Sequence, residues 1–155
     1  MDRKEYGEIV GVTDKAYYTN SFHVPVGFPI SLFDKINIEG KFHKYTNAGH
    51  ISYVEFDAPP KDNLAVIEKV IHTMHDADMG YAGINFPIDF CEKCNYSGII
   101  GDECPVCHSA EIRRVRRITG YLSTVDRFND AKKSELRDRV VHSLWVKLPN
   151  CGLLE

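Results

Sequence analysis

The sequence predicts a mixed α/β protein, and three observations support this prediction. A strand–helix–strand pattern occupies residues 50–86, two closely spaced pairs of cysteines follow within residues 91–107, and a last helical pattern begins near residue 129. Strand and helix signals that alternate along a chain are typical of α/β folds. A chain of 155 residues is also long enough to bury a core.

The composition is that of an ordinary soluble protein. Apolar residues make up 43% of the chain and charged residues 26%, and the formal net charge is -3. This balance gives no general attraction to nucleic acid or to an anionic membrane. No apolar run approaches the length of a membrane span, and residues 1–8 are too polar for a secretory signal. We therefore expect a cytoplasmic protein with neither a membrane nor a nucleic acid as partner.

The first third of the chain predicts short extended pieces and turns. Residues 6–56 combine β-branched and aromatic residues with frequent glycine and proline. The clearest strand in this region is residues 50–56.

The best-defined helix follows this strand. Pro59 and Pro60 end the strand, and Asp62 or Asn63 is then suited to cap a helix. The apolar stripe of that helix is Leu64, Ile67, Val70, Ile71 and Met74. Gly80 ends the helix, and residues 81–86 predict a second buried strand. A right-handed parallel crossover is the expected geometry.

Four of the five cysteines form two C-x-x-C pairs, nine residues apart. They are Cys91, Cys94, Cys104 and Cys107. In a reducing compartment such pairs indicate a metal site rather than disulfides. Two tight turns that face each other form the tetrahedral four-sulfur shell that zinc accepts, and a shell closed in this way is structural rather than catalytic. Iron in the same shell, a redox dithiol, and His108 in place of one sulfur are the alternatives.

The residue after each cysteine pair supports a metal-binding turn. This position usually needs a left-handed backbone, and here it is held by Asn95 and His108. Both types are among the few non-glycine residues enriched in that conformation. The fifth cysteine, Cys151, has no assigned role.

A basic run at residues 113–117 and a last helix complete the chain. The run suggests nucleic-acid binding as an alternative function, but the net charge is acidic and no aromatic residues alternate with the arginines to stack on bases. A solvated strand face, or ion pairs with Asp102, Glu103 and Glu111, would also explain the run. The last helix is expected from Asn129 or Asp130 to about Trp145, with Leu136, Val140 and Leu144 along one side.

Several segments together resemble one family. The two cysteine pairs, Arg116-Arg117-Ile118-Thr119-Gly120-Tyr121-Leu122 and Arg127-Phe128-Asn129-x-x-Lys132 are similar, in order and spacing, to the C-terminus of class III (anaerobic) ribonucleoside-triphosphate reductases. Residues 17–26, 47–53 and 83–87 also resemble that family. The resemblance covers residues 17–142.

The resemblance implies a fold and a division into domains. Residues 1–86 would be the C-terminal segment of a glycyl-radical-type β/α barrel. Residues 87–110 would be the zinc ribbon, and residues 111–155 would hold the glycyl-radical loop and the terminal helix.

The resemblance also implies an activity, with Gly120 as the catalytic residue. In such enzymes an activase that uses S-adenosylmethionine and a 4Fe-4S cluster removes a hydrogen atom from the glycine Cα. The radical later passes to a cysteine that begins the reduction of ribonucleoside triphosphates to deoxyribonucleotides for DNA synthesis. Glycine suits this role because it has no Cβ, so its α-carbon can flatten and its backbone can enter a tight pocket.

The partners implied by the resemblance are the rest of the reductase, the activase and, in the assembled enzyme, the substrate and a second copy. The radical-bearing cysteine of the family lies upstream of the matched region, and no cysteine precedes Cys91 here. We therefore expect a fragment or a split-gene product that is incomplete alone. Tyr17, Tyr18 and His23 are weak candidates for the active-site side of the barrel.

Two other functions are possible on the sequence. A zinc-ribbon module that binds nucleic acid or protein without radical chemistry is one. The other is a spare part that replaces a damaged radical domain in a formate–lyase-type enzyme, but such proteins lack the cysteine quartet.

Overall fold

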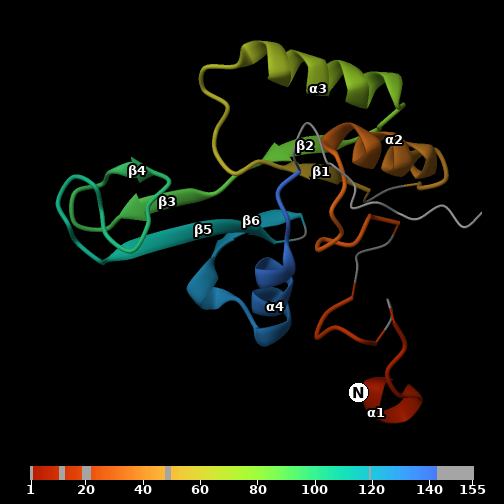
Figure 1. Cartoon of the computed structure of the whole chain (residues 1–155), viewed down its shortest axis with the longest axis horizontal. Helices are drawn as coiled ribbons and strands as arrows, with labels where there is room; N and C mark the ends of the chain where they lie inside the picture. Colours follow the sequence, from red (N-terminus) through yellow and green to blue (C-terminus); the bar gives the residue numbers. More distant parts are fainter. Residues whose placement is uncertain (1, 11–12, 19–21, 48–49, 119, 143–155) are drawn as a thin grey trace, which may run out of the picture. The chain divides into compact units, whose positions relative to one another are not determined.

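A computed structural model describes residues 2–10, 13–18, 22–47, 50–118 and 120–142 of the chain (Figure 1). The chain forms two compact units. We call Phe22–Asn85 with Val140–Glu155 the crossover unit, and Met1–Ser21 with Phe86–Arg139 the hairpin unit. Both units contain helices and strands, so the predicted mixed α/β class is confirmed. Within the described ranges, no helix is long and apolar enough to cross a membrane.

The crossover unit contains the predicted strand–helix–strand motif. Its elements are α2 (Leu32–His43), β1 (Ser52–Glu55), α3 (Leu64–Asp76) and β2 (Ala82–Asn85). The two strands pair in parallel, with Ser52 opposite Ala82 and Glu55 opposite Asn85. The parallel pairing and the predicted order of elements are thus confirmed.

The start of α3 is the one that the sequence indicates. Asn63 is its N-cap, and the side-chain oxygen of Asn63 accepts a hydrogen bond from the backbone N–H of Val66 at 3.2 Å. Such a cap satisfies one of the backbone donors that the first turn leaves unpaired. Val70, on the predicted apolar stripe, is fully buried.

A small apolar core joins the elements of the crossover unit. The buried members of this core are Leu32, Ile36, Val54 and Val70. They come from both helices and from β1, and Ile84 of β2 packs against them. The core therefore holds the two helices to the strand pair.

Helix α2 corrects the expectation of extended pieces and turns before residue 50. Its buried face carries Leu32 and Ile36 but also Lys35, Glu39, Gly40 and His43. When polar residues occupy the buried face of a helix, the apolar residues no longer recur with the helical period. The sequence pattern then does not indicate a helix. Ser31 caps this helix, and its side chain accepts from the backbone N–H of Asp34.

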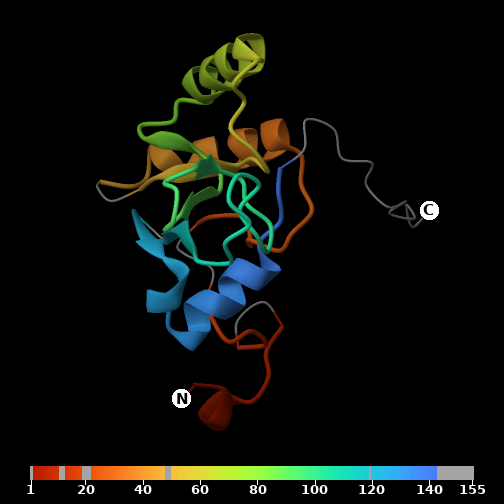
Figure 2. The same ribbon diagram turned by 90° about the vertical axis from the view of Figure 1, so that its left-hand side faces the viewer.

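The hairpin unit is built on a four-stranded antiparallel sheet. Its strands are β3 (Ile88–Cys91), β4 (Ser97–Gly98), β5 (Ile112–Ile118) and β6 (Tyr121–Thr124), in the spatial order β4-β3-β5-β6. The unit also contains α1 (Asp2–Tyr6), η1 (Val125–Arg127) and α4 (Asp130–Asp138). Figure 2 shows this unit with the loops that join β3, β4 and β5 towards the viewer.

Helix α4 begins where it was predicted but ends earlier. Asn129 is its N-cap, and the helix ends at Asp138, not near Trp145, which lies outside the described residues. Arg139 has an extended backbone. In the crossover unit, Val140 N–H donates to the carbonyl of Val26 at 2.9 Å, so residue 140 is not on a helical stripe. Tertiary backbone hydrogen bonds thus replace the predicted helical ones.

Candidate metal centre and glycine turn

The two cysteine pairs fold into two turns of the same construction. In the first, Asn95 N–H donates to the carbonyl of Cys91 at 2.9 Å, and in the second His108 N–H donates to the carbonyl of Cys104 at 3.0 Å. Asn95 has φ 60° and His108 has φ 56°. The predicted left-handed backbone after each pair is therefore confirmed at both positions.

The turns bring the four sulfurs together. Cys91, Cys94, Cys104 and Cys107 place their Sγ atoms within 4.8 Å of one another. The Cys91–Cys107 and Cys94–Cys104 sulfur distances are 3.4 and 3.5 Å. A tetrahedron with zinc–sulfur bonds of about 2.3 Å has sulfurs about 3.8 Å apart. The four thiols are free, so the quartet has the donor set and the spacing to hold zinc.

The centre is partly built into the core of the hairpin unit. Cys91 and Cys104 are buried and pack with Ile100, whereas Cys94 is exposed. Burial by itself raises the pKa of Cys104, but the backbone N–H groups of Cys107 and Val106 and the neighbouring sulfurs outweigh it and lower the pKa to about 6. A thiolate is the form that binds metal. Within the described part of the chain, the metal-ligating group consists of the four cysteines and does not include His108.

Gly120 lies in a tight turn between β5 and β6. Ile118 and Tyr121 are paired across this turn, so only two residues connect the strands. Gly120 has φ 87° and is exposed, and a Cβ added there would meet no atom within 4 Å. The positive φ favours glycine at this position. The space beside the α-carbon, where a side chain would begin, is therefore open.

Helix α4 contacts the residue that follows this glycine. The Lys132 ammonium donates to the hydroxyl of Tyr121 at 3.3 Å and lies 5.7 Å from the centre of its ring. Both residues belong to segments that the sequence singled out. The contact ties the end of the glycine turn to α4.

The basic run lies on β5, and its arginines point to alternate faces of the strand, as in any pleated strand. On one face, Arg114 and Arg116 pair with Asp89, with N···O distances of 3.5 and 2.6 Å. On the other face, Arg113 pairs with Glu92 at 3.1 Å. The predicted acidic partners, Asp102, Glu103 and Glu111, are wrong for these pairs. The antiparallel register brings β3 residues opposite the run instead.

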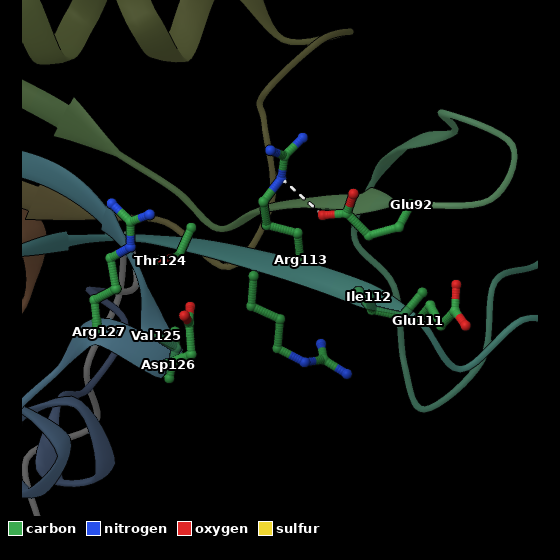
Figure 3. Close-up of a pocket in the computed structure, with 9 residues that line it drawn as sticks. Glu92, Glu111, Ile112, Arg113, Thr124, Val125, Asp126 and Arg127 are labelled. Atoms are coloured by element: carbon green, nitrogen blue, oxygen red, sulfur yellow. Dashed lines mark ion pairs between the residues drawn. The ribbon is translucent and has the colours of Figure 1, made fainter.

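An open groove runs along β5 and η1 in the hairpin unit (Figure 3). Its lining includes Arg113 and Arg127 but also Glu92 and Asp126. Because both signs of charge line it, the groove lacks the uniform positive field that attracts a polyanion. This groove therefore does not favour a polyanion such as nucleic acid.

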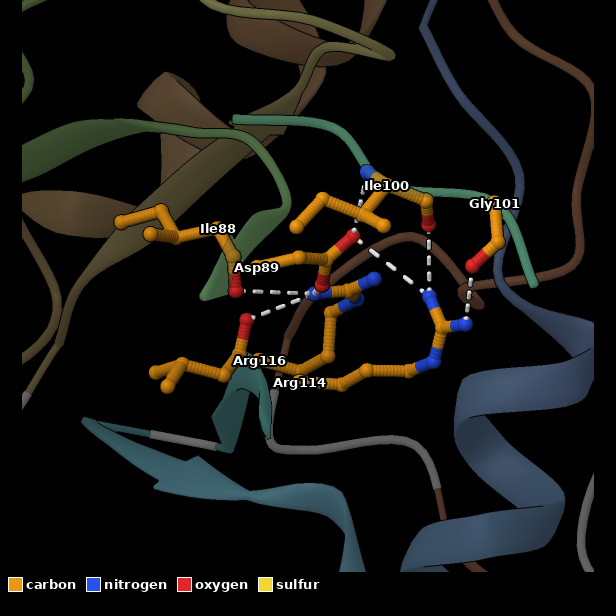
Figure 4. A network of polar contacts seen from close by, with 7 residues as sticks. Ile88, Asp89, Ile100, Gly101, Arg114 and Arg116 are labelled. Carbon is orange, nitrogen blue, oxygen red and sulfur yellow. Dashed lines mark hydrogen bonds and ion pairs between the residues drawn. The ribbon is translucent and has the colours of Figure 1, made fainter. Parts of the chain in front are cut away.

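Asp89 is the polar residue that sequence reasoning missed. It is 1% exposed and accepts hydrogen bonds from Arg116 and from the backbone N–H of Ile100 (Figure 4). A carboxylate two residues before Cys91 was a weak signal in the sequence. Its importance follows from the strand register, which the sequence did not reveal.

The weak barrel candidates fall in different units. Tyr17 belongs to the hairpin unit and donates to Asp138 at 2.8 Å. Burial, followed by this hydrogen bond, raises the pKa of Tyr17 well above its ordinary value. Tyr18 is exposed, and His23 belongs to the crossover unit, where its Nδ1 lies 3.3 Å from a carboxylate oxygen of Glu39. The contacts of Tyr17 and His23 account for these two residues structurally.

Comparison with solved structures shows related folds. The chain aligns with an anaerobic ribonucleotide reductase at a TM-score of 0.71 and 25% identity, covering 92% of this chain and 22% of that one. It aligns with the anaerobic ribonucleotide reductase from Thermotoga maritima with MES in the active site at a TM-score of 0.64 and 27% identity, covering 83% and 20% of the two chains.

Relatives that are similar in sequence match nearly the whole chain as well. The chain is 38% identical over 152 residues to the anaerobic ribonucleoside-triphosphate reductase of Escherichia coli, which covers 92% of this chain and 21% of that protein. It is 36% identical over 154 residues to the enzyme of the same name from Enterobacteria phage T4, covering 92% and 25%. The chain thus spans between about a fifth and a quarter of the length of these relatives.

A family model of anaerobic ribonucleoside-triphosphate reductase matches residues 1–142, which include both cysteine pairs and the glycine turn. On this match, the chain belongs to the anaerobic ribonucleoside-triphosphate reductase family.

Proposed function

We propose that this chain is the radical-storing C-terminal part of an anaerobic ribonucleotide reductase, with the radical at Gly120. The observation that carries the proposal is the glycine turn itself, in a chain of this family. Gly120 is exposed, has φ 87°, and has open space where a side chain would begin. An α-carbon in such a place is accessible to an enzyme that removes a hydrogen atom from it.

The proposed chemistry begins with an activase. A radical-S-adenosylmethionine enzyme with a 4Fe-4S cluster takes one hydrogen atom from the Gly120 Cα and leaves the unpaired electron on that carbon. Because glycine has no Cβ, the carbon can become planar and share the electron with the adjoining amide groups. In the assembled reductase the radical then passes to a cysteine of the remaining part of the enzyme.

The cysteine quartet is proposed to hold a structural zinc ion. Four sulfurs in tetrahedral reach suit zinc or iron, and zinc is the assignment that we make. In this division of labour, residues 1–86 complete the end of the barrel. Residues 87–110 form the zinc ribbon, and residues 111–155 carry the radical loop and the terminal segment.

The main proposed partner is the rest of the reductase, because this chain spans only about a fifth to a quarter of its relatives. The remaining N-terminal part of the reductase supplies the rest of the barrel, the radical-bearing cysteine and the pocket for the ribonucleoside triphosphate. The assembled enzyme is proposed to be a cytoplasmic homodimer that makes deoxyribonucleotides for DNA synthesis.

The test is anaerobic electron paramagnetic resonance of the chain mixed with its missing partner, the activase and S-adenosylmethionine. A doublet signal is expected, and exposure to air should then cut the chain at Gly120, which mass spectrometry detects. Gly120→Ala should abolish both the signal and the cut.

Gly101→Ala is the matched control for this substitution. Gly101 is also exposed, and a Cβ there would also meet no atom within 4 Å, but its φ is not positive. This variant should keep both the signal and the cut. A signal that survives in Gly120→Ala would overturn the assignment of Gly120. Complete absence of signal and cleavage in the unaltered chain would favour a binding module without radical chemistry.

A further inference from the structure

Asp89 is the centre of a buried polar network in the hairpin unit (Figure 4). Its Oδ2 accepts from the backbone N–H of Ile100 at 3.1 Å, and its Oδ1 accepts from the Arg116 guanidinium at 2.6 Å. A carboxylate that is 1% exposed must be paired and hydrogen-bonded, since an isolated buried charge is strongly unfavourable. The contacts of Asp89 meet this need from two separate segments.

Arg114 completes the connection between those segments. Its guanidinium donates to the carbonyl of Ile100 at 2.8 Å and to the carbonyl of Gly101 at 2.6 Å. Ile100 and Gly101 lie in the loop between the two cysteine pairs, which we call the inter-pair loop (residues 99–103). Asp89 and Arg114 therefore bind both backbone polar groups of Ile100.

Arg116 anchors the other end of the network. It donates to the carbonyl of Ile88 at 3.2 Å as well as to Asp89. Its position on β5 is paired with Ser123 of β6, two residue pairs away from the Ile118–Tyr121 pair that closes the glycine turn. The network thus links the inter-pair loop to the strand that leads into that turn.

We propose that Asp89, Arg114 and Arg116 are positioning residues that couple the order of the cysteine centre to the order of the glycine turn. When the four sulfurs are held together, the inter-pair loop is fixed and presents its backbone groups to Asp89 and Arg114. The arginines then hold β5 in register against β3. This inference deepens the proposed function by naming how one part of the site regulates the other.

The experiment uses the full 155-residue chain and measures hydrogen exchange by mass spectrometry with and without zinc. In the unaltered chain, zinc should slow exchange in the cysteine segment, residues 88–107, and also in residues 112–124. In Arg114→Gln, zinc should still slow exchange in the cysteine segment but no longer in residues 112–124.

Arg113→Gln is the matched control. It makes the same chemical change one residue earlier, on the opposite face of β5, where the side chain pairs with Glu92 and is 52% exposed, against 36% for Arg114. This variant should keep zinc protection in both segments. Asp89→Asn provides a second test of the network, with Asp102→Asn, an exposed position of the inter-pair loop, as its control.

Zinc affinity gives an independent readout. Coupling between two sites is reciprocal, and couplings commonly correspond to factors of about 5 to 150. Loss of the coupling should therefore weaken zinc binding of Arg114→Gln about tenfold in competition with a chromogenic chelator. The affinity of Arg113→Gln should stay within about twofold of the unaltered chain.

Two results would overturn the coupling. One is zinc protection of residues 112–124 in Arg114→Gln equal to that in the unaltered chain. The other is an unaltered chain in which zinc leaves residues 112–124 unchanged. Neither measurement needs a radical. A chain that shows the coupling but no radical signal at Gly120 would therefore refute the proposed function and leave the coupling standing.

Discussion

The two units of the chain are stabilised in different ways. In the crossover unit, the buried side chains of Leu32, Ile36, Val54 and Val70 form an apolar core between helices and strands. In the hairpin unit, the buried cluster around the cysteines consists of Cys91, Ile100 and Cys104. A segment with so little apolar burial needs another source of stability, and metal binding and buried ion pairs are the common ones.

Among the described residues, the most deeply buried carboxylates are Glu39 in the crossover unit and Asp89 in the hairpin unit, and their partners differ. Glu39 in the crossover unit is 0% exposed and lies 2.5 Å from the ammonium of Lys35 on the same helix. Glu39 also accepts from the backbone N–H of Val24 at 2.9 Å and lies 3.3 Å from Nδ1 of His23, so it joins α2 to the segment that precedes it. Asp89 in the hairpin unit joins β3 to β5 and to the inter-pair loop. The following predictions test this contrast, from the largest effect to the smallest.

Replacement of all four cysteines by serine should remove the fold of the cysteine segment and leave the crossover unit intact. Metal binding in small four-ligand sites contributes about 10–16 kcal/mol of apparent free energy, which here would be folding free energy of residues 88–107. Hydrogen exchange should show this segment unprotected, with zinc content near zero by mass spectrometry. Equal loss of protection in α3 (Leu64–Asp76) would show that the two units do not fold independently.

Leu32→Ala should destabilise the crossover unit and leave the cysteine segment intact. The side chain is 0% exposed, so its truncation should cost about 2–5 kcal/mol of the unfolding free energy of the crossover unit. Leu64→Ala is the control, because Leu64 is also the first residue of a helix but is 73% exposed, and its change should stay within about 0.5 kcal/mol. Urea unfolding measures both. A lower zinc content in Leu32→Ala than in the unaltered chain would contradict the view that the two units are stabilised in different ways.

The crossover unit should lose stability in acid through Glu39. Burial by itself raises the pKa of Glu39, but the nearby His23 imidazole and the charge and hydrogen bond of Lys35 outweigh it and lower the pKa from 4.5 to about 2. Because the folded pKa is the lower one, the stabilisation is fully present above about pH 4.5 and is lost as the pH falls towards 2. The loss should be about 3 kcal/mol.

Glu39→Gln should flatten this part of the pH profile and lower stability at neutral pH, since it leaves Lys35 without its carboxylate. Burial also lowers the pKa of His43, so a separate loss begins below about pH 6.5 and should persist in this variant. Glu68→Gln, at an exposed position of α3, is the control. An unchanged acid profile in Glu39→Gln would contradict the role of this carboxylate.

The smallest effect is expected at the two positions that close the cysteine turns. Asn95 and His108 both have positive φ, which glycine adopts freely and β-branched residues adopt poorly. Asn95→Gly and His108→Gly should keep zinc affinity, whereas Asn95→Val and His108→Val should lose about 1–2 kcal/mol, or about tenfold in affinity. Chelator competition measures the zinc affinity. If the valine variants bind zinc with the same affinity as the glycine variants, backbone strain at these two positions is refuted.

The sequence predicted the elements whose signals are local. The cap at Asn63 and the apolar stripe of α3 predicted that helix, and the cysteine spacing predicted both turns down to the left-handed Asn95 and His108. Helix α2 was missed because Glu39 and other polar residues share its buried face. The partners that stabilise this helix lie elsewhere in the chain, so the spacing of apolar residues along the helix does not reveal them.

The site was predictable to the same extent. Spacing alone grouped the four cysteines, which the structure brings together, whereas the role of Gly120 comes from the resemblance and stays a prediction. The partners of the basic run were not predictable, because they depend on the register that sets Asp89 opposite Arg114. The end of α4 was misplaced for a similar reason, since the residue after Arg139 bonds to the distant Val26.

The pairing of Ile88 with Val115 has a consequence for how this region can vary between relatives. Residues opposite each other in an antiparallel pair lie about 4.5–5.5 Å apart, so the chain leaves the cysteine segment where it entered it. The residues between Cys94 and Cys104 therefore form an excursion from the sheet, and the pairing of β3 with β5 fixes where this excursion begins and ends. Insertions and deletions in the part of this excursion that Asp89 and Arg114 do not bind would change its length while its ends, and the strand that leads to the glycine turn, keep their places.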